Sequence, residues 1–128
     1  MTNHRDPWPN LSDVTITTHG NSKVVFVAAQ VAENSALDIA DQTNEVLGLI
    51  DHLLAHAGAR REHIVSAQIS LVSTGDYADV IAVWNAWVAP GLAPVRATVG
   101  QKLIKNAHKV EIEVTAAFTL VRPPPTSK

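Results

Sequence analysis

The sequence contains no cysteine and no long hydrophobic run. The 128-residue chain can therefore form no disulfide, and the absence of thiols is compatible with a reducing compartment. Its longest apolar runs, such as 24–29, fall far short of the roughly 20 residues that a membrane-spanning helix needs. Residues 1–6 also lack the apolar segment of a signal peptide. We therefore expect a cytoplasmic protein with no membrane partner.

The chain also has no large excess of positive or negative charge. The 10 basic residues are scattered along the chain and the net charge is −2. Such a distribution provides no cationic face that could neutralise several phosphates. Nucleic acid is therefore not expected as the main partner.

The length and the 46% hydrophobic content match a single domain, 1–128, with one core. Prolines crowd both ends of the chain and occupy three successive positions at 123–125. Because proline donates no backbone hydrogen bond, it cannot continue a strand there. The expected flexible ends are 1–12 and 122–128, and the expected ordered core runs from about 13 to 121.

Hydrophobic periodicity predicts five strands and two helices in the order β-β-α-β-α-β-β, which is an α+β fold. Strict alternation of apolar and polar residues marks the strands, and a 3.6-residue period marks the helices. The predicted segments are strands at 14–18 and 24–31, a helix from Asp38 to Gly58, a strand at 65–71, a helix from an N-cap at Asp76 to before Pro90, and strands at 96–100 and 109–120.

The two amphipathic helices can cover only one face of this sheet. Val65 is expected on the covered face, and Tyr77 on the apolar stripe of the second helix with Trp84 and Trp87, which are expected in the core or at an interface. An antiparallel or mixed sheet can leave its second face open to water. Short, mostly uncharged side chains favour a subunit interface instead. The residues expected on that second face are Ser66, Gln68, Ser70, Glu111, Glu113 and Thr115.

Arg96 and Glu111 are the candidate catalytic residues. A period of two places Arg96 and Thr98 on one side of their strand and the apolar Val95 and Ala97 on the other, so Arg96 is expected on the polar face beside Glu111. A guanidinium there could hold a substrate carboxylate, and the glutamate could act as acid or base towards water. The alternative is that Arg96 forms a structural salt bridge with a glutamate.

Several segments resemble the RidA/YjgF reactive-intermediate deaminases, also described as L-PSP-type proteins. The most specific are Pro94-Val95-Arg96 and, about fifteen residues later, Glu111-Ile112-Glu113. Further similarity covers 25–30, the helix that contains Gln42, and 69–77. The resemblance implies a chorismate-mutase-like fold with one sheet and two helices on one face. It also implies a homotrimer whose sheets line a central barrel, with ligand sites between the subunits.

The resemblance further implies hydrolysis of reactive enamines or imines, such as 2-aminoacrylate, to a 2-keto acid and ammonia. Arg96 would hold the substrate carboxylate through two charge-assisted hydrogen bonds, a task for which lysine is less suited. Glu111 would position and polarise the attacking water as a general base. Imines hydrolyse readily, so neither a metal nor an organic cofactor is expected.

The chain departs from the family pattern at other ligand-site positions. Thr98 stands where the family often has cysteine, and Ile81 stands at the place of a frequent asparagine. Ala28 and Ala29 replace a Ser-Gly pair before Gln30. Since apolar side chains donate no hydrogen bond, we expect a rebuilt pocket for larger or more apolar carboxylate-bearing imines, such as aminomuconate. The expected substrate-binding residues are Arg96, Thr98, Ala29, Gln30 and Ile81.

Two other functions remain open at this point: a non-catalytic trimer that binds small carboxylates, and an RNA endonuclease. A metal site receives little support. His52 and His56 lie one helical turn apart, but the sequence offers no evident third ligand, so they are expected to be surface histidines.

Overall fold

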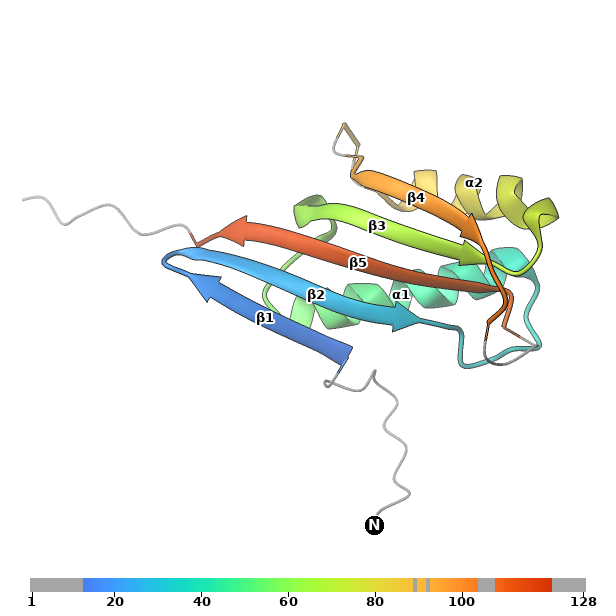
Figure 1. Ribbon diagram of the computed structural model, residues 1–128, viewed down its shortest axis with the longest axis horizontal. Helices are drawn as coiled ribbons and strands as arrows, with labels where there is room; N and C mark the ends of the chain where they lie inside the picture. The colour runs from blue at the N-terminus through green and yellow to red at the C-terminus, as the bar shows by residue number, and fades with distance from the viewer. Residues whose placement is uncertain (1–12, 89, 92, 104–107, 121–128) are drawn as a thin grey trace, which may run out of the picture.

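The computed structural model describes residues 13–88, 90–91, 93–103 and 108–120 of the chain (Figure 1). The predicted order of strands and helices is confirmed, and the ends expected to be flexible lie outside the described residues. Two short 3₁₀ helices, η2 and η3, are additional. The elements are β1 (Val14–His19), β2 (Ser22–Gln30), α1 (Ile39–His56), η2 (Arg61–His63), β3 (Ile64–Leu71), η3 (Thr74–Asp76), α2 (Tyr77–Trp87), β4 (Val95–Gly100) and β5 (Val110–Thr119).

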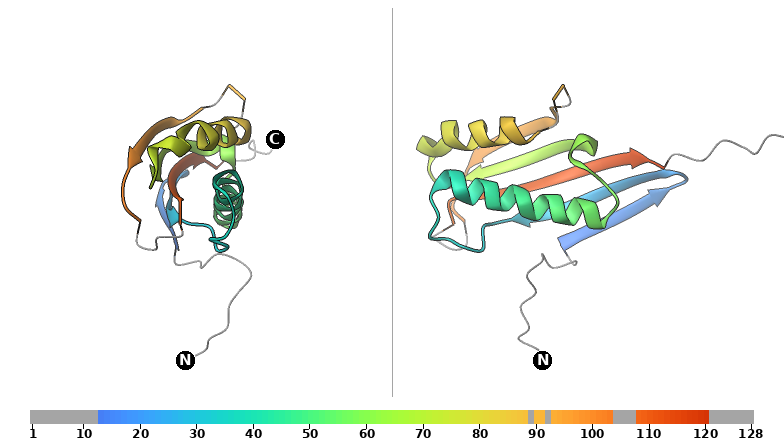
Figure 2. Two further views of the ribbon diagram at one scale, coloured as in Figure 1. Left: turned by 90° about the vertical axis from the view of Figure 1, so that its right-hand side faces the viewer. Right: turned by 180° about the vertical axis from the view of Figure 1, so that it is seen from behind.

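The strands form one sheet in the order β1-β2-β5-β3-β4. β3 and β4 are parallel and are connected through α2, whereas the other neighbours are antiparallel. Both helices lie on the same face of the sheet, and the opposite face is uncovered (Figure 2). The expected α+β arrangement, with one covered face, is therefore confirmed. None of the helices in the described residues is long and apolar enough to cross a membrane.

The ends of α1 follow from local chemistry. The Asp38 side chain accepts a hydrogen bond from the backbone N–H of Asp41 at 2.8 Å, which satisfies one of the free donors of the first turn. Just beyond the last turn, Gly58 has φ of +82°, a conformation that glycine adopts without a Cβ clash. Between these limits, an apolar stripe that includes Val46, Ile50 and Leu54 is buried against the sheet.

Three details differ from the periodicity-based expectation. Val65 is 48% exposed, because the pairing of β3 with β5 shifts between Ile64 and Ser66 and turns Val65 outward. Tyr77 is 45% exposed and does not belong to the core. Asp76 precedes α2 as expected, but its side chain makes no capping hydrogen bond, because the preceding η3 already holds its backbone in a helical conformation.

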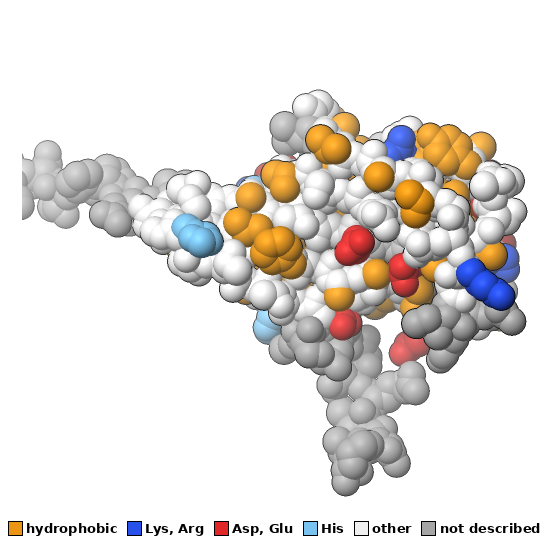
Figure 3. Space-filling view, viewed as in Figure 1, with side chains coloured by type: hydrophobic (Ala, Val, Ile, Leu, Met, Phe, Trp, Pro, Cys, Tyr) orange, Lys and Arg blue, Asp and Glu red, His pale blue; other side chains and the backbone are white. Residues whose placement is uncertain are grey.

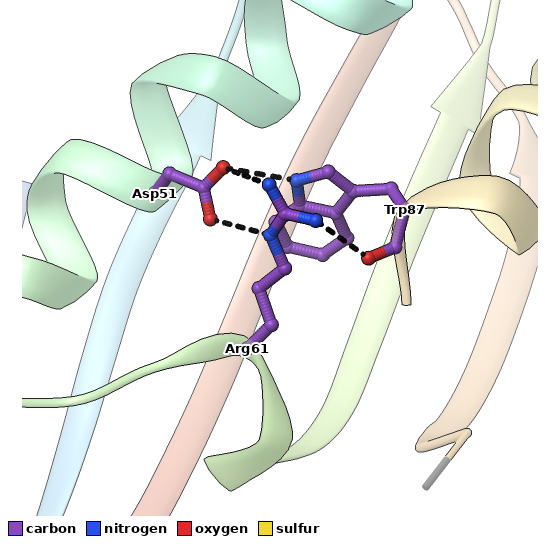
Figure 4. A network of polar contacts seen from close by, with 3 residues as sticks. All are labelled: Asp51, Arg61 and Trp87. Carbon is purple, nitrogen blue, oxygen red and sulfur yellow. Dashed lines mark hydrogen bonds and ion pairs between the residues drawn. The ribbon is translucent and has the colours of Figure 1, made fainter. Parts of the chain in front are cut away.

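A polar network joins α1, η2 and α2 (Figure 4). Arg61 binds Asp51 through two parallel hydrogen bonds of 2.9 and 2.8 Å, and its Nη1 donates to the carbonyl of Trp87 at 3.0 Å. The guanidinium lies 4.9 Å from the Trp87 ring centre, and the indole Nε1 donates to Asp51 at 3.1 Å. The hydrogen bond with Asp51 raises the pKa of Arg61. Every polar group of this network is paired with another member.

Arg61→Ala should therefore lower the free energy of unfolding by about 1–2 kcal/mol, since it removes a bidentate contact and a cation–π contact that are partly exposed. Arg61→Lys should restore only part of this loss, because an ammonium group lacks the planar fork. Urea unfolding measures both changes. Arg60→Ala is the matched control, because the Arg60 side chain is 72% exposed and forms an ion pair with the neighbouring Glu62 rather than with Asp51 or Trp87. An equal effect of the two alanine variants would contradict a stabilising role for the network.

Candidate functional site

Arg96 and Thr98 lie on β4, which forms an edge of the sheet among the described residues. In the parallel pairing with β3, Arg96 lies beside Ala67 and Thr98 beside Ile69. Ala67 and Ile69 are buried under the helices, so Arg96 and Thr98 point to the helix-covered side. The expectation that Arg96 shares the polar face with Glu111 is therefore wrong. The apolar side of β4 faces outward instead, and Val95 is 77% exposed.

Glu111 lies on the uncovered face, where β5 pairs it with Ser70. Across the sheet, β5 lies two strands away from β4. Along β5, Glu111 lies three residues from Val114, which stands in the same cross-strand row as Arg96. Strand spacings place the two Cα atoms roughly 14 Å apart. A single subunit consequently does not bring Arg96 and Glu111 together.

Two polar atoms on β4 are buried without a hydrogen-bond partner in the part of the chain that the structure describes. They are Nη1 of Arg96 and the hydroxyl oxygen of Thr98. Burying a donor without a partner is unfavourable, and an ionised donor more so than a neutral one. Arg96 and Thr98 are alternate residues of the strand, so their Cα atoms are about 6.5–7 Å apart and their side chains leave the same side of β4. Unsatisfied donors of this kind are ready to bind a polar ligand.

The predicted site residues of β2 lie elsewhere in the subunit. The pairing of β2 with β5 shifts between Val27 and Gln30, and this bulge leaves Ala28 and Ala29 both exposed. The Gln30 side chain is buried, and its Nε2 donates to Asp13 at 3.2 Å and to the carbonyls of Ala28 and Ala29 at 3.0 and 3.4 Å. The Gln30 amide nitrogen thus holds the bulge.

Gln30 and Thr98 stand at opposite ends of one row across four strands, with Ile112 and Ile69 between them. Three strand spacings separate them by roughly 14 Å. Ile81, the remaining predicted binding residue, lies on α2, where it is partly buried and packs against the core. The predicted substrate-binding residues thus fall into separate places within one subunit: Arg96 and Thr98 on β4, Ala29 and Gln30 at the end of β2, and Ile81 on α2.

The uncovered face also contains an open groove of about 400 Å³ that the site prediction missed. Acidic side chains lie near the centre of this face, with hydrophobic side chains on either side (Figure 3). The alternation of β3 and β5 already marked this face as polar, but it gave no sign of a hollow. The side chains that point to it are Ser66, Gln68, Val95, Ala97, Glu113 and Thr115.

A larger hollow of about 830 Å³ lies between α1 and α2 and includes Asp51, Arg61 and Trp87. Because these residues bind one another, the charges of Arg61 and Asp51 are already paired within this hollow. The described residues also contain no group of three histidine, aspartate or glutamate side chains that could hold a metal ion. Neither feature competes with the β4 site.

The fold and the edge-strand arginine define a small α+β protein of the YjgF type. The family model described as Endoribonuclease L-PSP matches residues 9–118 of the chain. The chain therefore belongs to the L-PSP family, which is also known as the YjgF or RidA family. The resemblance read from the sequence is confirmed.

The relatives share most of the chain. A RutC family protein of Haemophilus influenzae is 43% identical over 111 residues, which cover 86% of this chain and 92% of that protein. The RutC family protein YoaB of Escherichia coli is 39% identical over 106 residues, covering 83% and 89%. NMB1025 of Neisseria meningitidis, a YjgF family member, is similar in structure with a TM-score of 0.70 and 36% identity, covering 84% of this chain and 96% of that chain. A Pseudomonas aeruginosa protein has a TM-score of 0.73 and 39% identity, covering 80% and 87%.

Arg96→Met tests whether Arg96 is a ligand-binding residue or a structural one. Since Nη1 has no partner among the described residues, replacing the guanidinium by an apolar side chain should leave the free energy of unfolding unchanged or raise it by up to about 1 kcal/mol. Urea unfolding at one fixed protein concentration measures this change. A loss of about 3 kcal/mol or more would instead indicate a structural salt bridge, because breaking a buried ion pair leaves an uncompensated charge.

Proposed function

We propose that this protein is a hydrolytic deaminase that converts carboxylate-bearing enamines and imines to keto acids and ammonia. The observation that carries the proposal is the buried, unpartnered Nη1 of Arg96 beside the equally unpartnered hydroxyl of Thr98. A guanidinium in this state gains most from a carboxylate, which it binds through two parallel hydrogen bonds. Family membership supports the same reaction class.

The reaction requires little from the protein beyond orientation and proton transfer. An enamine first takes a proton on carbon and becomes the imine. Glu111 then accepts a proton from water as the water oxygen attacks the carbon of the protonated imine. In the resulting carbinolamine, Glu111 returns this proton to the nitrogen and the hydroxyl gives up its own, so that the C–N bond breaks, the C=O bond forms and ammonia leaves. The products are the 2-keto acid and ammonia. Arg96 holds the substrate carboxylate throughout and keeps the imine carbon within reach of the water.

We further propose that the working unit is a homotrimer and that each site is completed by the next subunit. β1 pairs with β2 only as far as Val27, so 28–30 has no partner strand on that side among the described residues. Glu111 lies next to this segment, because Gln30 pairs with Ile112 on β5. In a head-to-tail ring, the β4 edge of one subunit can lie against residues 28–30 and Glu111 of the next subunit. Three subunits would close this ring.

The uncovered face supports this assembly. Phe26 and Val65 are 46% and 48% exposed on the sheet, in addition to the outward Val95. Apolar side chains at these positions gain from burial against another subunit. In such a ring, Arg96 and Thr98 of one subunit would face Ala29, Gln30 and Glu111 of its neighbour. This arrangement would reunite the two catalytic residues that a single subunit separates.

A non-catalytic carboxylate-binding trimer is the second candidate, and the apolar side chains of Ala28, Ala29 and Ile81 favour it. They supply no hydrogen-bond donors around the substrate. RNA cleavage, which the family description names, receives less support, because the net charge is −2 and the uncovered face presents Glu111 and Glu113. We propose a cytoplasmic location and a small-molecule substrate, with no cofactor.

The direct test measures the release of keto acid from two kinds of substrate. One is the set of imines that an amino-acid oxidase generates in solution, and the other is an aminomuconate. Arg96→Ala and Glu111→Gln should each lower kcat/KM by about 100-fold or more, since one loses the charge-assisted carboxylate contact and the other the general base. Arg60→Ala, which removes an exposed guanidinium far from β4 in the sequence, should keep wild-type activity. Equal activity in all variants would refute the site. Binding of a keto acid by the wild type, lost in Arg96→Ala, without any turnover would favour the non-catalytic candidate.

Mixing the two inactive variants tests the shared site. When Arg96→Ala and Glu111→Gln subunits are unfolded together and reassembled in equal amounts, about one quarter of the interfaces should pair an intact Arg96 with an intact Glu111 of the neighbour. The mixture should regain about that fraction of the wild-type rate, whereas each variant treated alone should stay inactive. No recovery in a mixture that reassembles into trimers would contradict a site built by two subunits.

A further inference from the structure

We infer that Thr98 is a specificity-determining residue that binds a second, uncharged polar group of the substrate. This inference rests on the proposed function, since it concerns the same site. The preferred substrates are then imines that carry an amide, hydroxyl or keto oxygen a few bonds away from their carboxylate. The buried hydroxyl of Thr98, which has no partner, is the observation that points to such a group.

The surroundings of Thr98 explain why the chain itself does not satisfy this hydroxyl. On the covered face, the residues paired with Thr98 across the neighbouring strands are Ile69 and then Ile112. Both members of this row are fully buried and carry no polar side-chain atoms. The first polar side chain in the row is Gln30, whose Nε2 already donates to Asp13 and two carbonyls. Among the described residues, the neighbouring members of this row thus offer the hydroxyl no partner, and a molecule that enters from the β4 edge can supply one.

The shape of the site limits the length of that molecule. Arg96, Thr98 and Gly100 follow one another along the covered side of β4. At Gly100 the side chain of Thr74 from η3 lies 3.5 Å from the place that a Cβ would occupy. A substrate held at Arg96 by its carboxylate can thus extend along β4 as far as Thr98. Beyond Thr98, the side chain of Thr74 in η3 occupies the space beside Gly100. The Cα atoms of Arg96 and Thr98 are roughly 6.5–7 Å apart, so the second polar group of the substrate should lie only a few bonds from its carboxylate.

Charge decides which second group fits. A threonine hydroxyl is a neutral donor, and Arg96 is the cation of this side of β4. A second carboxylate at Thr98 would be buried without a cation of its own, which is unfavourable, whereas an amide or hydroxyl oxygen is uncharged and can accept the hydrogen bond that Thr98 donates. The proposal therefore narrows the expected preference for larger or more apolar carboxylate-bearing imines to those with an uncharged second polar group. It favours imines derived from amino acids such as asparagine and glutamine.

Imines of matched shape provide the test. The imines of asparagine and leucine are nearly isosteric, as are those of glutamine and methionine, and within each pair only one carries the second acceptor. Thr98→Val, which keeps the shape but removes the hydroxyl, should lower kcat/KM for the asparagine and glutamine imines by about tenfold. It should change the leucine and methionine values by no more than about twofold, and Thr98→Ser should retain the wild-type selectivity.

Two further readouts separate this inference from the proposed deaminase activity and from a structural role. Calorimetric binding of the matching 2-keto acids should show the same selectivity and the same loss in Thr98→Val, even if the protein turned out to have no turnover. Without ligand, Thr98→Val should unfold at an equal or higher urea concentration, because it removes an unpartnered buried hydroxyl. An equal effect of Thr98→Val on both members of each pair, or a lower unfolding midpoint that Thr98→Ser restores, would overturn the inference.

Discussion

The chemistry available to this protein depends on how β4 is hydrogen-bonded to β3. Their parallel register sets Arg96 beside Ala67, and a shift by one residue would turn every side chain of β4 to the other face. In the observed register a guanidinium nitrogen and a hydroxyl are buried on the helix side, while Val95 and Ala97 face outward. The same pairing thus creates both an unsatisfied polar site and an apolar edge that a neighbouring subunit can cover.

Most of the fold could be predicted from the sequence, because each element carries its own periodic signal. The helix predicted from Asp38 to Gly58 is observed as α1, with its apolar stripe buried and Gly58 just beyond its last turn. The alternation of β5 also placed Ile112 inward and Glu111 outward correctly. One failure lies at an irregular point of a strand: a change of register at Val65 interrupts the alternation of β3.

The candidate site was harder to predict because it lies on an edge strand. The usual rule assigns the apolar side of a strand to the core, and for β4 this rule put Arg96 on the wrong face. An edge strand can expose its apolar side to a partner and bury a polar side chain for a ligand, and one sequence does not distinguish these arrangements. The sequence named Arg96 and Thr98 as candidate site residues. The face of the sheet to which their side chains point became known only from the pairing of β4 with β3. The groove beside Gln68 and Glu113 carried no sequence signal of its own.

The central claim is that the unpaired nitrogen of Arg96 is reserved for a substrate carboxylate at a site closed by the next subunit. A crystal structure of the protein grown with a saturating 2-keto acid tests this claim most directly. We predict a trimer in which the keto-acid carboxylate accepts two hydrogen bonds from Arg96, with Ala29 and Glu111 of the adjacent subunit beside the keto carbon. An Arg96 guanidinium paired with a protein carboxylate, and no keto acid on β4, would contradict the account.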